Sequence, residues 1–158
     1  DDSQSDDSPM EPQPPIGEDN ADGGNGEADD SPAPERDGEC ELQFRAEARD
    51  SSGRCTSCQD GDAITVYAVV ENPCDVALSY RSNRSCIASE FTVLNLMARS
   101  SAVYPMTCRV VARIDEIAPG SSITQSRPAG RLSANRYELS VQFEDPDRTI
   151  RVETFTVE

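Results

Sequence analysis

The sequence predicts an all-β domain, folded as an antiparallel β-sandwich of seven or eight short strands and preceded by a disordered acidic tail. The fold class follows from two observations. Apolar and polar residues alternate in short runs along residues 40–158, and turn-forming residues separate those runs. The tail follows from a third observation, because charge and hydrophobicity change abruptly near residue 39.

Seven runs have the period of a β-strand. The clearest is Tyr137–Phe143, in which every second residue is large and apolar. The run that begins at Phe91 also shows helical spacing as far as Ala102, but the β propensity of Phe91, Thr92 and Val93 favours a strand there. The expected strands are 42–48, 64–70, 76–80, 91–96, 109–117, 137–143 and 150–157.

Turn-forming residues lie between the runs. Asn72-Pro73, Pro119-Gly120, Pro128-Ala129-Gly130 and Asp145-Pro146-Asp147 combine a fixed φ with residues that tolerate a positive φ. Residues 144–147 join two alternating runs, and they therefore predict a β-hairpin.

The chain divides into two regions by composition. Residues 1–39 hold 14 of the 30 acidic residues and one of the 14 arginines, a net charge of −13. They have few large apolar side chains, so the apolar surface they could bury does not offset the entropy of ordering them. We expect residues 1–39 to be a disordered acidic linker. Residues 40–158 hold 16 acids and 13 arginines, a net charge of −3, and have the size of one domain.

The composition argues against several classes of protein. The sequence contains no Lys, His or Trp, and all 14 basic residues are arginine. Catalytic triads that need His, Schiff-base chemistry at Lys and His-ligated metals are therefore excluded, and we expect neither an enzyme nor a cofactor. The acid excess disfavours nucleic acid as a partner. No apolar run approaches the ~18 residues that span a membrane. The acidic run 19–27 does not have the register of an EF-hand calcium loop.

Six cysteines predict three disulfides and an oxidising, extracytoplasmic compartment. If residues 41–49 and 63–71 form an antiparallel pair, the numbers of opposed residues sum to about 112, which places Cys40 beside Cys74. Cys55 and Cys58 then share the loop at the other end, and the last two cysteines remain for each other. The expected bridges are Cys40–Cys74, Cys55–Cys58 and Cys86–Cys108.

The segment Cys55-Thr56-Ser57-Cys58 has two other interpretations. It matches the CxxC spacing of redox enzymes, although the nearby Asp60 and Asp62 disfavour a thiolate. It could also bind zinc together with Cys40 and Cys74, although a structural zinc site usually has a second close pair of ligands. A structural bridge is the favoured interpretation.

Six landmarks lie in a fixed order within residues 64–143. They are 70–75 (VENPCD), 76–80 (VALSY), 91–93 (FTV), 103–104 (VY), 117–122 (IAPGSS) and 132–141 (LSANRYELSV). In order and spacing they resemble the bacterial family named after the BsuPI intracellular proteinase inhibitor. In that family a Trp usually follows the Pro-Gly strand and Gly usually stands at the position of Asn135. The resemblance implies an immunoglobulin-like sandwich and, as an activity, protease inhibition.

Tyr137 has an expected structural role that does not depend on this resemblance. It opens the penultimate strand, where a buried ring with its hydroxyl bonded to nearby backbone would pin a corner of the sandwich.

Two functions are expected. The first is a non-catalytic binding or structural module that is exported or tethered to a bacterial surface. Its acidic linker would act as a spacer after removal of a signal segment, with a lipid anchor upstream of Asp1. The alternative is a protease inhibitor. The segment 98–106 is expected to be an exposed partner loop, tied at one end by Cys108, and its contact residues are Arg99, Val103, Tyr104, Pro105 and Met106.

Overall fold

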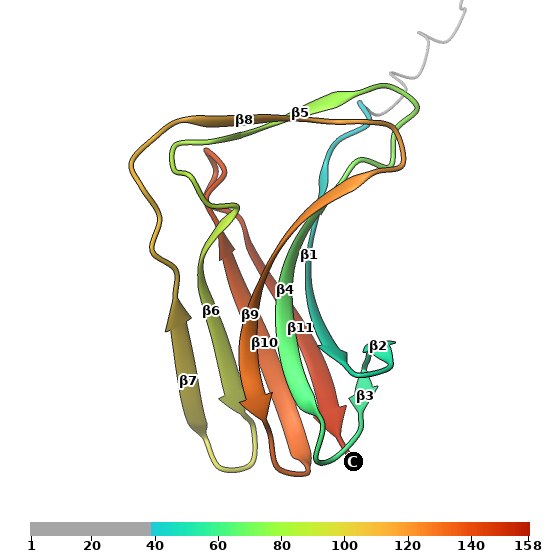
Figure 1. The fold of residues 1–158 in the computed structure, drawn as a ribbon, viewed down its shortest axis with the longest axis vertical. Coiled ribbons are helices and arrows are strands. Elements are labelled where there is room, and N and C mark those ends of the chain that lie inside the picture. Colours follow the sequence, from blue (N-terminus) through green and yellow to red (C-terminus); the bar gives the residue numbers. More distant parts are fainter. Residues whose placement is uncertain (1–38) are drawn as a thin grey trace, which may run out of the picture. The chain divides into compact units, whose positions relative to one another are not determined.

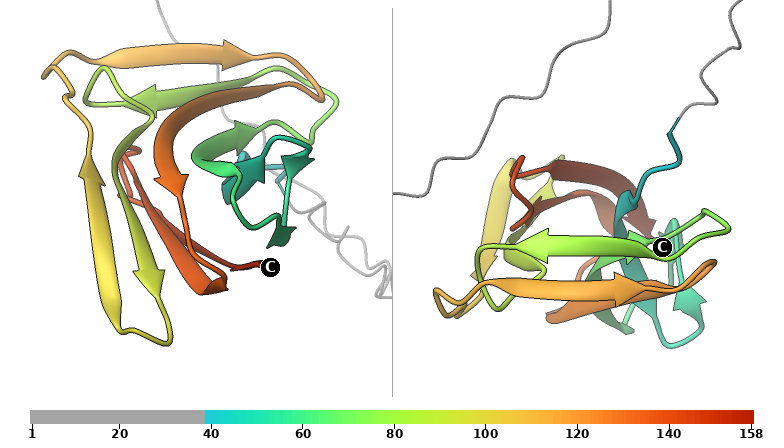
Figure 2. Two further views of the ribbon diagram at one scale, coloured as in Figure 1. Left: turned by 60° about the horizontal axis from the view of Figure 1, so that its bottom comes forward. Right: turned by 90° about the horizontal axis from the view of Figure 1, so that it is seen from above.

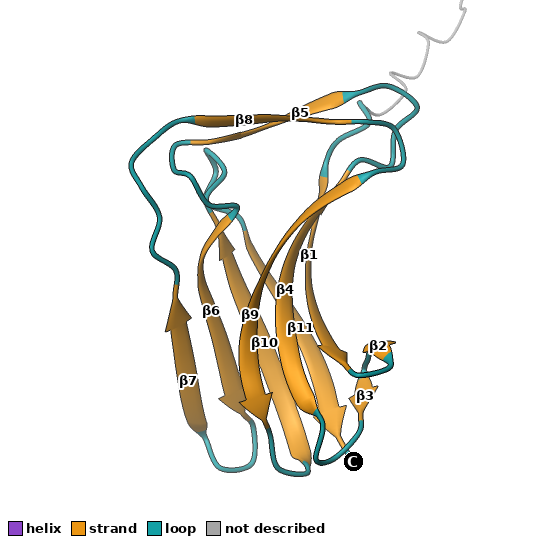
Figure 3. Ribbon diagram, in the orientation of Figure 1, coloured by secondary structure: helices purple, strands orange, loops and turns teal. Residues whose placement is uncertain are grey.

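The computed structural model describes residues 39–158, so the expected linker lies outside the described residues apart from Glu39. Within the described range the chain forms β-strands and no helix (Figure 3). The same residues therefore include no helix long and apolar enough to cross a membrane. The prediction of an all-β sandwich is confirmed.

The strands form two large sheets and one two-stranded ribbon. The sheets have the strand orders β2-β1-β4-β9 and β3-β11-β10-β6-β7, and β5 pairs with β8 to form the ribbon. Figure 1 shows the ribbon crossing one end of the long strands, and Figure 2 shows the same crossing from above. The strands are β1 Gln43–Asp50, β2 Gly53–Arg54, β3 Ser57–Cys58, β4 Ala63–Glu71, β5 Leu78–Ser82, β6 Ala88–Asn95, β7 Ser100–Pro105, β8 Arg113–Ile117, β9 Ser122–Arg131, β10 Asn135–Phe143 and β11 Ile150–Val157.

The strand order is that of an immunoglobulin-like sandwich. One sheet places the first strand beside β4 and then β9, and the other places the last two strands beside β6. The fold departs from that arrangement at the ribbon, because β8 pairs with β5 and belongs to neither large sheet. The described residues form eleven strands, against the seven or eight expected.

The core follows directly from the period-2 alternation. Ile64, Val66, Ala68 and Val70 of β4 are buried, and they belong to the same core cluster as alternate residues of β10. Aromatic rings fill the centre in the absence of Trp. The Phe44 and Phe143 rings meet edge-to-face at 5.0 Å, and the Tyr137 and Phe155 rings stack at 5.5 Å.

Gln125 is a polar residue that links the two sheets. It lies on β9, and its Oε1 accepts hydrogen bonds from the backbone N–H of Ile87 and of Ala88, at 2.7 and 3.2 Å. Its Nε2 donates to the carbonyl oxygen of Ala88 at 2.9 Å. One side chain therefore fixes the start of β6 against the opposite sheet.

The β1–β4 ladder confirms the antiparallel pairing on which the cysteine argument depends. Every pair sums to 114, from Gln43–Glu71 to Arg49–Thr65, rather than to the expected 112. Cys40 and Cys74 continue the observed register.

Strand β9 was not expected, because Pro128-Ala129-Gly130 suggested a loop. Proline is tolerated here because β9 is the edge of its sheet, where one N–H needs no partner in the ladder. The register shifts between Ile64 and Thr65, opposite this segment, and Gly130 has a φ of +80°. The segment is therefore a bulge within a strand, not a break.

Candidate functional site

The three disulfides join the cysteines in the expected pairs. Cys40–Cys74, Cys55–Cys58 and Cys86–Cys108 are bonded, and no cysteine of the described residues is free. Three such bridges in one small domain indicate an oxidising, extracytoplasmic environment.

The Cys55–Cys58 bridge closes one side of the sandwich. Both cysteines are buried, and the N–H of Cys55 donates to the carbonyl oxygen of Ala48 at 3.0 Å. Cys58 itself lies on β3, which pairs in parallel with β11 at the edge of the five-stranded sheet. Redox CxxC motifs lie at helix N-termini, whereas this one lies in a strand-flanked loop. The geometry therefore supports a structural bridge.

Asp50 lies beside this bridge. Its carboxylate accepts hydrogen bonds from the hydroxyl and the N–H of Ser52 and from the N–H of Gln59, and these bonds hold its pKa below the ordinary value. A carboxylate within 4.8 Å of both sulfur atoms disfavours a thiolate on either cysteine.

The four-cysteine zinc interpretation is wrong. Cys40–Cys74 lies beyond the Gln43–Glu71 end of the β1–β4 ladder, and the Cys55–Cys58 loop follows its opposite end. A strand of eight residues separates the two pairs, so their sulfur atoms cannot reach one ion.

The segment expected to be a partner loop is not a loop. Residues Ser100–Pro105 form β7, which pairs with β6 over six positions. The run is rich in small residues, and its weak alternation concealed the strand. Two of the expected contact residues make contacts within the domain and are only partly exposed. The Tyr104 hydroxyl donates to the carbonyl oxygen of Ala129 at 3.3 Å, and Met106 packs against the core. Arg99, Val103 and Pro105 are exposed.

The turn between β6 and β7 is held by Asn95. Its Oδ1 accepts hydrogen bonds from the N–H groups of Met97 and Ala98, at 3.1 and 2.9 Å. Arg99 then adopts a φ of +52°, in the left-handed region that side chains disfavour.

Replacing Arg99 by Gly is expected to raise the free energy of unfolding by about 0.5 kcal/mol. Glycine has no Cβ penalty at positive φ, and this gain exceeds the entropy that glycine adds to the unfolded chain. Urea unfolding of the full chain measures the change. Ala98→Gly, one residue earlier and without positive φ, should lower stability instead, and a gain there of equal size would contradict the assignment.

The most exposed apolar side chains near the ribbon lie within residues 109–117, which the alternation predicted to form one strand. Residues 109–112 carry no strand, because β8 begins only at Arg113. Val110 is 83% exposed, and Val111 and Ile114 are 58% and 67% exposed. We call Val110, Val111 and Ile114 the valine patch. The signal in the sequence was the Val110-Val111 pair, separated from Cys108 only by Arg109, which breaks the alternation of the run.

A disulfide and two hydrogen bonds hold the backbone next to the valine patch. The Cys86–Cys108 bridge holds the start of residues 109–112. Arg109 exchanges two hydrogen bonds with Ser85, since its N–H donates to the Ser85 hydroxyl at 2.9 Å and its carbonyl oxygen accepts from the Ser85 N–H at 3.0 Å. The apolar tip therefore projects from an anchored backbone.

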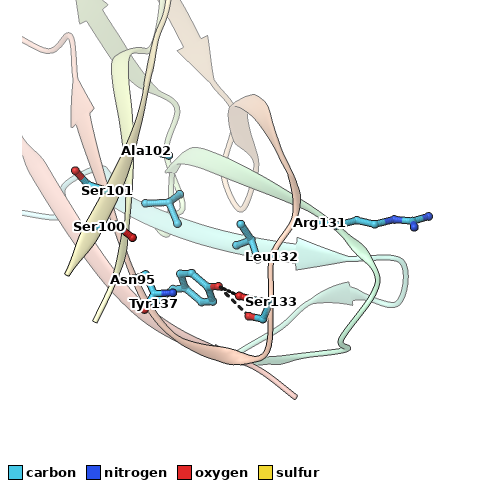
Figure 4. Close-up of a pocket in the computed structure, with 9 residues that line it drawn as sticks. Asn95, Ser100, Ser101, Ala102, Arg131, Leu132, Ser133 and Tyr137 are labelled. Atoms are coloured by element: carbon cyan, nitrogen blue, oxygen red, sulfur yellow. Dashed lines mark hydrogen bonds between the residues drawn. The ribbon is translucent and has the colours of Figure 1, made fainter. Parts of the chain in front are cut away.

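Tyr137 forms the expected corner. Its ring is buried and its hydroxyl donates to the carbonyl oxygen of Ser133 at 2.8 Å, with the Ser133 hydroxyl at 3.2 Å. Figure 4 shows both contacts, with the ring in the wall of a cavity and Arg131 pointing away from it. The cavity measures about 290 Å³ and lies between the ends of the two sheets. Its lining residues are Val93, Asn95, Ser100, Ser101, Ala102, Arg131, Leu132, Ser133 and Tyr137.

Replacing Tyr137 by Phe is expected to cost about 1 kcal/mol or more of stability, because the Ser133 carbonyl oxygen loses its donor while the ring still packs on Phe155. The free energy of unfolding in urea measures the loss. Tyr67→Phe, on the outer face of β4, is the matched control and should have less effect. An unchanged unfolding midpoint for Tyr137→Phe would contradict the proposed role of Tyr137 at the corner.

Tyr80 is a second buried tyrosine, in the ribbon. Its hydroxyl donates to the carbonyl oxygen of Ile87 at 3.0 Å, and burial, with a smaller contribution from the Asp145 carboxylate, raises its pKa from 10.0 to about 12. It borders a hollow of about 260 Å³ that Leu42, Phe44 and the β10–β11 turn also line.

This raised pKa predicts a loss of stability at high pH. The folded state disfavours the tyrosinate, so the contribution of Tyr80 is complete below pH 10 and disappears as the pH rises towards about 12. Ultraviolet titration should show a tyrosine that ionises late, together with unfolding. Tyr80→Phe should remove that late step, and its persistence would assign the step to another residue.

Arginines on the outer face of the first sheet are engaged by carboxylates. Glu47 is buried there, with contacts to Arg45, Arg49 and Arg54 at 3.4, 2.9 and 3.9 Å. Arg49 also lies over the ring of Tyr67, 4.0 Å from its centroid. This arrangement fits a structural ion cluster better than a site for a phosphate backbone.

Comparison with known proteins leaves the family open. No protein-family model matches the chain, and no curated protein matches it. Among solved structures, a β-glucosidase from Listeria innocua in complex with glucose is similar over 73% of this chain, with a TM-score of 0.36 and 10% identity. A β-glucosidase involved in saponin metabolism from intestinal bacteria is similar over 76%, with a TM-score of 0.32 and 11% identity. The chain spans 16% of the length of each enzyme, and similarity at this level supports no conclusion about its function.

Proposed function

We propose that the domain is a non-catalytic binding module that acts outside the cytoplasm and contacts a protein partner through the valine patch. The observation that carries this proposal is the exposure of Val110 and Val111 on an anchored segment and of Ile114 at the second position of β8. Apolar side chains exposed to water are unfavourable by about 25 cal/mol for each Å² of apolar surface, and a bound partner recovers that free energy.

The disulfides support export, and the charge of the linker supports display. In this proposal residues 1–39 act as a spacer between the domain and a lipid anchor upstream of Asp1, because a chain segment with a net charge of −13 repels itself. A peptide map of the native protein, digested without reduction and with free thiols blocked, tests export. Three bridges without a labelled thiol are expected, and labelled Cys55 or Cys58 would contradict it.

Photo-crosslinking in intact source cells tests the contact surface. A photoreactive residue at Val110 should give a discrete protein adduct, and adding Ile114→Asp should abolish it. The control is the same residue at Val152, which is 55% exposed on β11 but lies outside the valine patch. Equal adducts from both positions, or none from Val110, would refute this surface.

One observation favours the second candidate function, a protease inhibitor. An inhibitor needs a firmly held segment that enters a protease cleft without being released, and residues 109–112 are exposed, carry no strand and follow a disulfide-bonded cysteine. The contact segment then moves from residues 98–106 to residues 109–112. Titration against a panel of serine proteases at micromolar concentration tests this candidate, and no inhibition of any of them would eliminate it.

A further inference from the structure

Most sheet edges in residues 39–158 carry features that prevent pairing with another chain. Charged side chains, prolines, bulges and very short strands are the usual devices. Strand β9 has a bulge, and β2 and β3 are two residues long. The charged or proline residues at these edges and in the ribbon are Arg54, Arg81, Arg113, Asp115, Glu116, Arg127, Pro128 and Arg131.

Strand β7 differs from these edges. It is the outer strand of the five-stranded sheet, it is six residues long, and its sequence SSAVYP contains no charge. Its pairing with β6 is regular over all six positions, without a bulge, and its single proline stands at the last position. An uncharged and regular edge is a template for another strand.

The side chains of β7 are suited to pairing with themselves. Ser100, Ala102 and Tyr104 share the face of the sheet that carries the buried Val93 and Phe91, which are opposite Ala102 and Tyr104. Ser100 and Ala102 are themselves exposed at the edge. In an antiparallel pair centred on Ala102, Tyr104 of each strand is opposite Ser100 of the other. Ser100 borders the 290 Å³ cavity, so this register places a large ring beside a small side chain at a hollow.

We propose that β7 is a dimerisation edge, at which two copies of the chain pair antiparallel with Ala102 opposite Ala102 and join their five-stranded sheets into one. Ser101 and Val103 face outward and are exposed. In this register Ser101 of each copy is opposite Val103 of the other copy, so the same pair occurs on both sides of the two-fold axis.

Charge sets the conditions for this dimer. Each chain has a net charge of −16, so two copies repel each other at a distance, but no like charges oppose each other along β7. Added salt screens the long-range repulsion and leaves the backbone hydrogen bonds, so the dimer should become tighter as salt rises. An edge of six residues is a small interface, for which we expect micromolar affinity.

Sedimentation equilibrium of the full oxidised chain across the micromolar range tests the proposal. The wild type should show a concentration-dependent dimer. The double variant S101E/V103E places Glu opposite Glu at both outward positions, and S101R/V103R does the same with Arg, so each alone should be monomeric. An equimolar mixture of the two should restore a dimer, because every outward pair then has opposite charges.

The matched control moves the same charges away from the edge. Val152 and Thr154 lie on β11, face outward and are exposed, so V152E/T154E should dimerise like the wild type. Unfolding midpoints of all variants show that each one folds. A wild type that stays monomeric throughout, a dimer that persists in S101E/V103E, or a mixture that stays monomeric would each overturn the proposal.

Discussion

Replacing Asn72 by Asp is expected to destabilise the domain by at least about 3 kcal/mol. Asn72 is 0% exposed, and its Nδ2 donates to the carbonyl oxygens of Val76 and of Ile117, each at 2.8 Å. A carboxylate of the same shape would turn an oxygen toward both carbonyls and bury a charge. The loss is large against the 5–15 kcal/mol that usually separates a folded domain from its unfolded state.

The control for this prediction is Asn95→Asp, the same substitution elsewhere in the chain. Asn95 uses its Oδ1 as an acceptor for the N–H groups of Met97 and Ala98, and a carboxylate keeps that role. Its cost should stay within about 0.5 kcal/mol. Urea unfolding at neutral pH with the disulfides intact measures both variants, and comparable losses would show that the donor bonds of Asn72 do not matter.

Removing the disulfides one at a time is expected to give losses that follow the length of the closed loop. In the chain-entropy model, replacing both cysteines by Ala should cost about 4 kcal/mol for Cys40–Cys74 and about 3 kcal/mol for Cys86–Cys108. The value for Cys55–Cys58 should be about 2 kcal/mol. The corresponding sequence separations are 34, 22 and 3 residues.

Free energies of unfolding of the three double variants test this order. Cys58 is among the most buried cysteines, so its replacement by Ala also removes packing. A loss for Cys55–Cys58 that equals or exceeds the other two would contradict loop entropy as the main source and assign the effect to packing.

The sequence was sufficient for the fold class because the core strands alternate. Strands β4 and β10 bury every second residue along most of their length, and the pairing of β1 with β4 was sufficient to predict the disulfides. The corner at Tyr137 and the positive φ of Gly120 were also predicted, since each depends on local chemistry.

The sequence was insufficient at the sheet edges and at the ribbon. An edge strand such as β7 or β9 buries few side chains, so its composition is close to that of a loop. Val110 and Val111 were wrongly placed in a strand for a related reason, because apolar residues outside a strand resemble apolar residues within one. No sequence pattern predicted the role of Gln125, because its hydrogen bonds to the opposite sheet depend on the distance between the two sheets.

The Cys40–Cys74 bridge has a mechanical consequence. Without it, tension on the chain ahead of Cys40 would act on the end of β1 and open the β1–β4 hydrogen bonds one after another. The covalent bond instead passes the load to Cys74, three residues beyond the end of β4, so the force bypasses that ladder. A domain that is tethered through its N-terminal side and pulled by flow would then begin to unfold at another place, or would not unfold until the sulfur–sulfur bond is reduced.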